Sequence, residues 1–298
     1  MASRYEFDMG AYTMTASPDQ AAEATRIRNG DIPNGREMEA AMKKEYDRGL
    51  MYAEACFETF RVIDGALFRW SQHERRLKGG LADFGLVLPE GLEIRCLEAA
   101  RTCASDALVR LTVTGGSAPW GMMPPERREP GVYVQTIPYA APREALHMRS
   151  VTWPWPLLPR PAKFTADYAA TLRGLRLLND ALSDGESALV CDTAHVCAAT
   201  TANVLIHRQG VWWTPAHVGA LPGVVRTALL EAFAVREVDC PRAWLADCEA
   251  MALVSSGVFI RPVASVDGRA LVRDAALFGP LWQALAGEHG VPAGVGGC

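Results

Sequence analysis

Lysine is rare in this chain, and one lysine occurs in an unusual setting. Among 298 residues there are four: Lys43, Lys44, Lys78 and Lys163. The first three have charged neighbours, as on a solvated face, whereas Lys163 lies in the segment Pro161-Ala162-Lys163-Phe164-Thr165, ahead of a stretch rich in Ala and Leu. An amine condenses with an aldehyde, which a guanidinium cannot do, and burial favours its neutral, nucleophilic form. Lys163 is therefore a candidate for covalent catalysis, although a lysine at a domain edge with its stem packed and its ammonium in water gives the same pattern.

Three further segments offer donors for a phosphate group. The run Leu221-Pro222-Gly223-Val224-Val225 is typical of a helix start, where unpaired backbone N–H groups and the helix dipole favour anions. Ser255 and Ser256 lie in a predicted turn between two strands, and Arg76 lies in a predicted helix. Each feature is common by itself. Together with the Lys163 amine, they would suit a phosphorylated aldehyde.

The order and spacing of these segments resemble a known family. The chain is similar to the fold-type IV pyridoxal-phosphate enzymes, which include branched-chain aminotransferases, D-amino-acid aminotransferases and aminodeoxychorismate lyases. The similarity extends over roughly residues 45–268 and depends on the order of its motifs rather than on any single one. The matching segments are 47–52, 57–62, 64–65, 68–70, 73–77, 110–116, 162–168, 192–193, 200–204, 214–215, 221–226 and 261–263.

The resemblance implies a role for individual residues. Lys163 matches the lysine that forms a Schiff base with pyridoxal 5′-phosphate and moves a proton between substrate and cofactor, and Tyr168 matches the tyrosine that bonds the cofactor's phenolic oxygen. Leu221 matches the residue that packs on the pyridine ring. The phosphate site corresponds to Arg76, the amides of Val224 and Val225, and Ser256 with its neighbour Ser255. The substrate pocket corresponds to Tyr52, Phe57 and Arg61, although Tyr52 and Phe57 also suit a hydrophobic core.

One position departs from the family. Family members have a glutamate that pairs with the pyridine nitrogen and keeps it protonated, where this chain has Ala198 followed by Ala199. Losing that charge-assisted hydrogen bond weakens the stabilisation of a carbanion. Three explanations stay open: a hydroxyl such as Thr200 or Thr201 contacts a neutral nitrogen, another acid comes from elsewhere in the fold, or the protein has lost fast transamination.

These alternatives lead to three functional hypotheses. The first is an aminotransferase-like enzyme that acts on an amino acid or amine, with an oxo acid as acceptor. The second is a pyridoxal-phosphate-dependent lyase that eliminates part of its substrate. The third is a catalytically altered or inactive family member.

The elements that would position these residues form an α+β pattern. The first half alternates short strands with two helices, at 71–84 and 89–103, and predicts a small α+β domain at 1–140. The second half, 141–298, contains many short strands with few helices, at 167–182, 223–234 and 275–285. This pattern indicates a larger, mixed and partly barrel-like β domain. A weak helix is expected at 34–48, and the Gly-rich tail after about residue 291 is expected to be disordered.

Composition narrows the class of protein. The hydrophobic content of 49% is that of a globular chain, and a net charge of -4 argues against nucleic acid as a partner. The start of the chain does not resemble a signal peptide, and no apolar run is long enough to span a membrane. Eight scattered cysteines form no C-x-x-C pair, so no metal site is expected. We expect a cytoplasmic homodimer whose partner is a small-molecule substrate.

Overall fold

A four-stranded antiparallel sheet forms the first part of the computed structural model, which describes residues 46–103, 106–183, 185–216, 219–232 and 235–292. Its strand order is β3-β2-β4-β6. The strands are β2 Ala55–Ile63, β3 Ala66–Leu67, β4 Ala107–Thr114 and β6 Gly131–Pro138. Along β4, buried and less buried residues alternate as a strand with one covered face requires.

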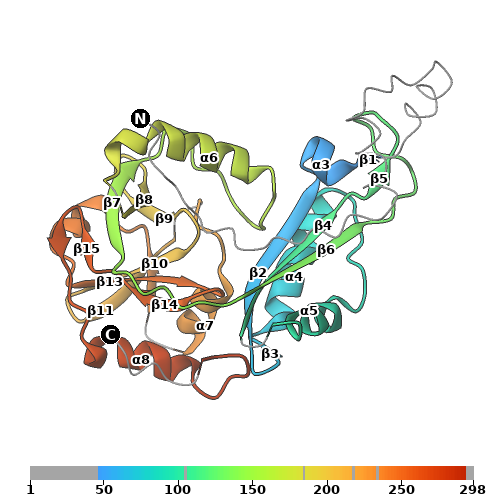
Figure 1. Ribbon diagram of the computed structural model, residues 1–298. Helices are drawn as coiled ribbons and strands as arrows, with labels where there is room; N and C mark the ends of the chain where they lie inside the picture. The colour runs from blue at the N-terminus through green and yellow to red at the C-terminus, as the bar shows by residue number, and fades with distance from the viewer. Residues whose placement is uncertain (1–45, 104–105, 184, 217–218, 233–234, 293–298) are drawn as a thin grey trace, which may run out of the picture. The chain divides into compact units, whose positions relative to one another are not determined.

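Two helices cover that face (Figure 1). They are α4, Trp70–Asp83, and α5, Leu92–Ala100. In α4 the buried positions are His73, Leu77, Gly80 and Leu81, a spacing that places them on one side of a helix. Their contacts with β2 and β4 form a hydrophobic core, so α4 is fixed with His73 directed at the sheet.

Two mixed five-stranded sheets form the rest of the described chain. One has the order β16-β15-β7-β8-β9, and the other β12-β11-β10-β13-β14. Pairs β7–β8, β7–β15 and β11–β12 are parallel, and the others are antiparallel. The first sheet contains β7 His147–Thr152, β8 Glu186–Cys191, β9 Val196–Ala199, β15 Ser265–Val266 and β16 Arg269–Ala270. The second contains β10 Asn203–Arg208, β11 Val211–Pro215, β12 Arg236–Val238, β13 Ala250–Ser255 and β14 Phe259–Pro262.

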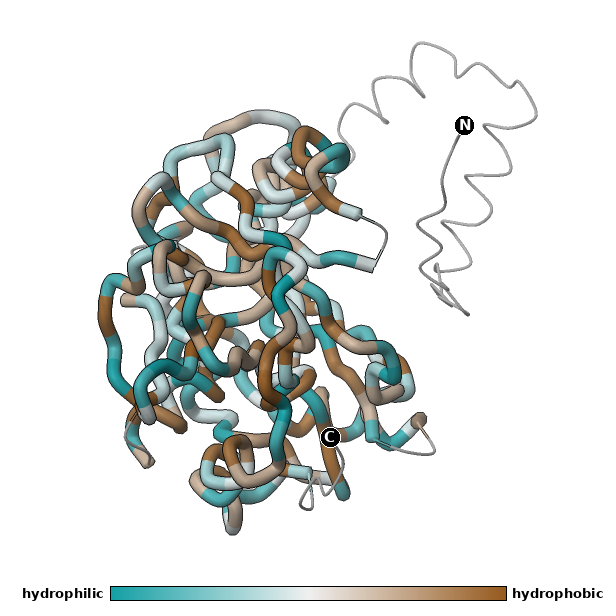
Figure 2. The backbone as a smooth tube through the Cα atoms, turned by 90° about the vertical axis from the view of Figure 1, so that its left-hand side faces the viewer, coloured by the Kyte–Doolittle hydropathy of each residue, from teal (hydrophilic) through white to brown (hydrophobic). Residues whose placement is uncertain are grey.

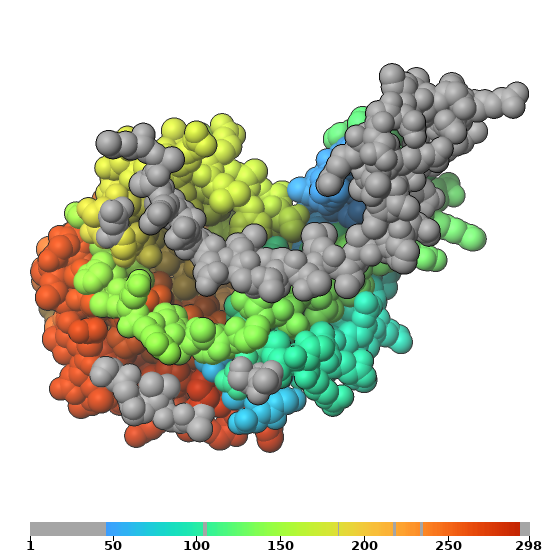
Figure 3. Space-filling model, in the orientation of Figure 1, coloured from blue at the N-terminus to red at the C-terminus, as the bar shows by residue number. Residues whose placement is uncertain are grey.

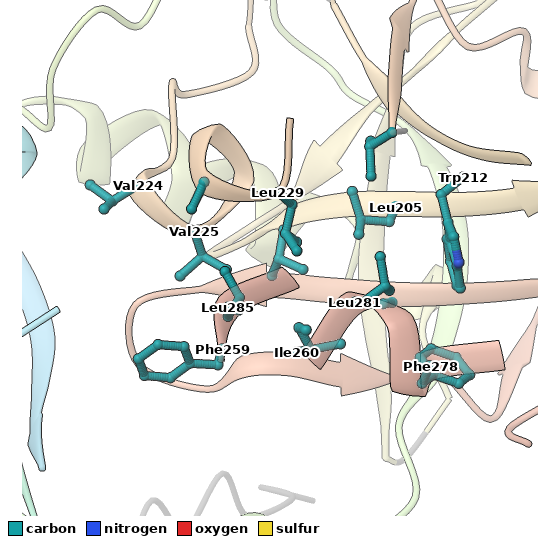
Figure 4. Packing of buried hydrophobic residues seen from close by; sticks show 14 of the residues in the cluster. Leu205, Trp212, Val224, Val225, Leu229, Phe259, Ile260, Phe278, Leu281 and Leu285 are labelled. Carbon is teal, nitrogen blue, oxygen red and sulfur yellow. The ribbon is translucent and has the colours of Figure 1, made fainter. Parts of the chain in front are cut away.

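Three helices accompany these sheets: α6 Asp167–Leu177, α7 Val224–Ala232 and α8 Ala275–Leu285. Figure 4 shows apolar side chains of α7, α8 and the second sheet pointing toward one another. The α7 side of this core includes Val224, Val225 and Leu229, all buried. Because its side chains are locked into the core, the N-terminus of α7 is held in a fixed place. The predicted α+β fold with mixed sheets is confirmed.

Several smaller elements complete the chain. These are β1 Tyr46–Asp47, α3 Arg48–Tyr52, β5 Ser117–Ala118 and the 3₁₀ helices η1 Asn179–Ala181 and η2 Arg242–Ala246. Figure 2 shows short apolar stretches interrupted by polar ones along the backbone. Among the described residues, no helix has the length and apolar character needed to cross a membrane.

Some boundaries differ from those the sequence predicts. Helix α4 begins at Trp70 rather than after a Ser71 cap, because Arg69 turns the chain with a left-handed φ of 48°. The helix expected at 167–182 ends at Leu177 and continues as η1. The helix expected at 34–48 lies mostly outside the described residues, as does the tail from residue 293. The described residues from Tyr46 onward belong to one compact unit, so a domain boundary near residue 140 stays a prediction.

Candidate active site

The backbone around Lys163 is paired with strand β2. The Phe57 N–H donates to the Lys163 carbonyl at 2.9 Å, and the Thr165 N–H donates to the Ala55 carbonyl at 3.0 Å. A side chain at Gly80 of α4 would place its Cβ 2.6 Å from the Ala162 Cβ, so the glycine permits this close approach. Figure 3 shows yellow-green and blue surfaces of the chain meeting one another. Between these parts of the sequence, the Thr165 hydroxyl donates to the Ala53 carbonyl at 3.1 Å. Lys163 is therefore held by the strand rather than by a free loop.

The Lys163 amine lies in a setting that favours its neutral form. Burial lowers the pKa of Lys163 from 10.5 to about 8; the charge of Glu58 opposes this shift, while the cations Arg76, Arg110 and Arg160 add to it. At pH 8 about half of such amines are neutral, compared with well under one in a hundred at an ordinary lysine pKa. The site thus supplies a nucleophilic amine near neutral pH.

An aromatic pair and an arginine lie beside this amine. The Lys163 Nζ is 5.5 Å from the centre of the Phe57 ring. Phe57 stacks on Tyr168, with ring centres 5.1 Å apart and planes inclined by 20°. Arg110 donates to the Tyr168 hydroxyl oxygen at 2.9 Å and places its guanidinium 3.9 Å from the Phe57 ring centre. The structure therefore brings Lys163, Phe57 and Tyr168 together, and adds Arg110, for which the sequence predicts no separate role.

A buried polar network joins α4, β2 and the turn after β13. Both oxygens of Glu58 accept hydrogen bonds from Arg76, at 2.7 and 2.6 Å, and Oε2 also pairs with the His73 Nδ1 at 2.8 Å. The His73 Nε2 lies 3.2 Å from the Ser256 hydroxyl. Burial alone would raise the Glu58 pKa, but the hydrogen bonds from Arg76 and His73 outweigh it and hold this pKa at about 2. Glu58 is therefore a permanent anion that orients Arg76.

The protonation of His73 follows from these partners. Burial lowers the pKa of His73, so the ring is neutral. An anionic carboxylate can only accept, which assigns the hydrogen to Nδ1 and leaves Nε2 to accept from the Ser256 hydroxyl. Sequence reasoning gave neither Glu58 nor His73 a role.

Arg76 also reaches the start of α7. Its Nη1 donates to the Pro222 carbonyl at 2.7 Å. The Asn203 side chain donates to the Leu221 carbonyl at 2.8 Å, and a Cβ on Gly223 would lie 2.0 Å from the Asn203 Oδ1, so glycine is needed for this turn to close on Asn203. The first N–H groups of a helix have no intrahelical acceptor. The hydrogen bonds of Arg76 to described residues use three of its five N–H groups, and one of these bonds holds the guanidinium at the start of α7.

The remaining predicted site residues have other neighbours. The Tyr52 hydroxyl accepts from the Gly121 N–H at 3.1 Å. Arg61 pairs with Asp106 at 2.6 Å and stacks on Tyr139. The described contacts of Tyr52 and Arg61 do not include Lys163, so their place in a substrate pocket stays a prediction.

The hydroxyls named from the sequence also differ in setting. The Ser255 hydroxyl accepts from the Val258 N–H at 3.4 Å, and Thr201 is exposed. Thr200, in contrast, lines a cavity of about 210 Å³ together with the buried Ala198 of β9. Of these hydroxyls, Thr200 is therefore the one that shares a cavity with the alanine at the family's glutamate position.

Comparison with known proteins agrees with this geometry. The amino-transferase class IV family model matches residues 55–266. A Methanocaldococcus jannaschii protein with the provisional name branched-chain-amino-acid aminotransferase is 27% identical over 241 residues, covering 76% of this chain and 83% of the relative.

Solved structures share the fold. The branched-chain aminotransferase of Thermoproteus uzoniensis, solved with norvaline, has a TM-score of 0.67 and 21% identity over 80% of this chain and 86% of its own. A Legionella pneumophila protein provisionally named 4-amino-4-deoxychorismate lyase has a TM-score of 0.67 and 22% identity over 80% of this chain and 92% of its own. The motifs, the fold and the extent of the family match together lead to one conclusion: the chain belongs to the class IV aminotransferase family.

Proposed function

We propose that this protein holds pyridoxal 5′-phosphate as a Schiff base on Lys163 and transfers an amino group from an amino acid or amine to an oxo acid. The observation that carries this proposal is the Lys163 amine, which is fixed against β2 and has a pKa of about 8. The class IV family generally uses this cofactor. The burial of Lys163 lowers its pKa and so makes its amine nucleophilic near neutral pH.

The other residues of the site fit a phosphorylated aldehyde. A phosphate needs N–H and O–H donors, and the Arg76 guanidinium is held at the N-terminal side of α7 by its bond to the Pro222 carbonyl. Glu58 orients the Arg76 guanidinium through two hydrogen bonds. This arrangement supports a phosphate site formed by Arg76 and the amides of Val224 and Val225. Ser256 would join it when its hydroxyl turns from the His73 Nε2, to which it donates here, toward the phosphate.

Tyr168 and Lys163 would then act on the part of the cofactor that reacts with the substrate. Because Arg110 donates to the Tyr168 oxygen, the Tyr168 hydroxyl hydrogen is left to donate to a second oxygen, such as the phenolic oxygen of the cofactor. The cofactor, when bound, supplies a conjugated ring that withdraws electrons from the substrate Cα. As a free amine, the Lys163 Nζ would be basic enough to take a proton from the substrate Cα and to return it to another carbon. The proposed role of Lys163 is thus both covalent and acid–base.

A lyase is the second candidate, and one observation favours it. Strand β9 presents Ala198 to the cavity where family members have a carboxylate. Weaker electron withdrawal by the ring would slow transamination more than it slows an elimination that expels a good leaving group. Cytoplasmic location and a homodimer stay predictions.

Product analysis distinguishes the two activities. The purified protein with added cofactor is incubated with a panel of amino donors and one oxo-acid acceptor, and separately with an amino-acid substrate that carries a β leaving group. We expect transfer of the amino group to the acceptor in wild type and in Lys78→Ala, whose altered lysine is exposed on α4, and none in Lys163→Ala. Release of an eliminated fragment without amination of the acceptor would instead support the lyase. Activity that survives in Lys163→Ala would contradict both.

A further inference from the structure

The cavity beside Ala198 is lined by both apolar and polar residues. Its lining includes Ala198 and Thr200, the rings of Trp153 and Trp155, and the pair Arg160 and Asp167. The volume of about 210 Å³ leaves room for part of an aromatic ring system. Most of the lining is apolar, so the few polar atoms that face it determine which ligand group it accepts.

Asp167 and Arg160 form an incompletely satisfied pair in this wall. The Arg160 Nε is 3.5 Å from the Asp167 Oδ2. These two atoms are buried, although 35% of each side chain is exposed, and neither atom has a hydrogen-bond partner among the residues that the structure describes. A buried carboxylate oxygen without a donor is costly, and a ligand N–H placed there would remove that cost.

Helix α6 is built to present Asp167 to the cavity. Asp167, Ala170 and Thr171 line it, a spacing that places them on one face of the helix. The position of the helix is set by Trp153, which packs so closely on Gly174 that a Cβ there would lie 2.5 Å from the ring. The Trp155 Nε1 also donates to the Ala170 carbonyl at 3.2 Å.

The same turn of α6 connects this cavity with the Lys163 amine. Asp167 follows Lys163 by four residues, and the next residue, Tyr168, stacks on Phe57 beside the amine. Arg160, which forms part of the cavity wall, is one of the cations that lower the Lys163 pKa. A ring attached at Lys163 and bonded by Tyr168 would lie close to the first turn of α6, and Asp167 of that turn also lines the cavity with Ala198.

We propose that Asp167 is the carboxylate that contacts the pyridine nitrogen of the cofactor and keeps it protonated, in place of an acid on strand β9. This inference depends on the proposed function and deepens that function. It names the residue that would make the cofactor ring an electron acceptor in a chain that has Ala198 on strand β9. Asp167 is a residue of α6, so the acid would reach the ring from the helix instead of from the sheet.

The Thr200 hydroxyl is the competing partner in this cavity. A hydroxyl hydrogen-bonds a neutral nitrogen, but it carries no charge to hold a pyridinium proton. A carboxylate forms a charge-assisted bond that is roughly twice as strong as a neutral one. The protonation state of the ring nitrogen therefore distinguishes Asp167 from Thr200.

The test uses the whole protein loaded with cofactor labelled with ¹⁵N in the ring. The ¹⁵N chemical shift reports whether the nitrogen is protonated, and it is followed as a function of pH without turnover. We compare wild type, Asp167→Asn and Thr200→Val, with Asp180→Asn as a control at an exposed aspartate of η1. We expect a protonated nitrogen in wild type, Thr200→Val and Asp180→Asn. In Asp167→Asn its titration midpoint should fall by about one to two pH units, which is a ten- to hundredfold change in the protonation constant.

A double variant tests whether the loss of the protonated signal in Asp167→Asn is caused by misfolding. Asp167→Asn combined with Ala198→Glu should recover the protonated signal, because it returns a carboxylate to the cavity from strand β9. A neutral nitrogen in wild type, or a protonated one that is unaffected by Asp167→Asn, would overturn the assignment while Lys163 still carries the cofactor. If reduction with borohydride finds no cofactor on Lys163 in wild type, the proposed function itself fails, and this inference with it.

Discussion

Replacing Glu58 by Gln removes the anion at the centre of the network that joins α4, β2 and the β13–β14 turn. Glu58 accepts two hydrogen bonds from Arg76 and one from His73, and only 1% of it is exposed. The variant keeps the size and shape of the side chain but leaves the Arg76 guanidinium without a counter-charge. We expect it to destabilise the protein and to do so in a pH-dependent manner.

The pKa shift of Glu58 gives the size of the expected loss of stability. A fall from 4.5 to about 2 on folding corresponds to a stabilisation of about 3 kcal/mol at neutral pH, at about 1.4 kcal/mol for each pKa unit. Because the folded-state pKa is the lower one, this contribution is complete above the unfolded pKa of 4.5. It is lost as the pH falls from 4.5 through 2, and roughly half of it remains at pH 3.

Urea unfolding of the cofactor-free protein at several pH values measures this contribution. The difference in unfolding free energy between wild type and Glu58→Gln should be largest above pH 5 and should shrink by roughly half between pH 6 and pH 3. Glu98→Gln, at an exposed position of α5, serves as the matched control and should leave the pH dependence unchanged. A Glu58→Gln protein whose stability falls with acid as steeply as that of wild type would refute the reasoning.

Three further predictions concern the approach of Lys163 to α4, the phosphate site and the amine. Gly80→Ala should destabilise the protein by about 1–3 kcal/mol in thermal unfolding because its Cβ meets Ala162, whereas Gly79→Ala, which has open space, should be neutral or stabilising; equal effects would contradict the packing. Arg76→Lys should weaken cofactor retention in equilibrium dialysis by roughly tenfold or more, since one ammonium cannot replace the fork of N–H groups; unchanged retention would argue against a phosphate site there. The rate at which added cofactor is captured, followed by absorbance, should rise about tenfold per pH unit up to pH 8 and then level off, because only neutral Lys163 reacts; a flat profile would contradict its low pKa.

The parts of the site that local sequence could predict are those defined by short spacings. Lys163 and Tyr168 are five residues apart, and Leu221 to Val225 carries its own helix-start signal. Such features depend on residue type and local backbone, which are visible without knowledge of the fold. The family match over residues 55–266 agrees with them.

The network behind Arg76 could not be predicted in the same way. Its members are joined across long separations: Ser256 meets His73 from 183 residues away, and Arg76 meets Pro222 from 146 away. Glu58 resembles any strand residue until it is known to be buried against the Arg76 guanidinium and the neutral His73 ring. A charged residue on an otherwise apolar strand beside predicted donors is the one sequence signal that could have indicated it.

Arg61 and Asp167 show two different limits of predicting site residues from local sequence. Arg61 lies in a motif that resembles the family, yet its guanidinium pairs with Asp106 and stacks on Tyr139. Asp167 carries no motif of its own, and it becomes a candidate because the fold places it in one cavity with Ala198. Which face of a helix lines a cavity depends on packing, here that of Trp153 against Gly174, which local sequence does not determine.

The attachment of the cofactor to Lys163 can be measured directly. The protein is loaded with pyridoxal 5′-phosphate, reduced with borohydride and digested, and the modified peptide is identified by mass spectrometry. The account predicts a single stoichiometric adduct on Lys163, with exposed Lys78 unmodified and no adduct in Lys163→Ala. A stoichiometric adduct on another lysine, or none on a correctly folded protein, would contradict the central claim.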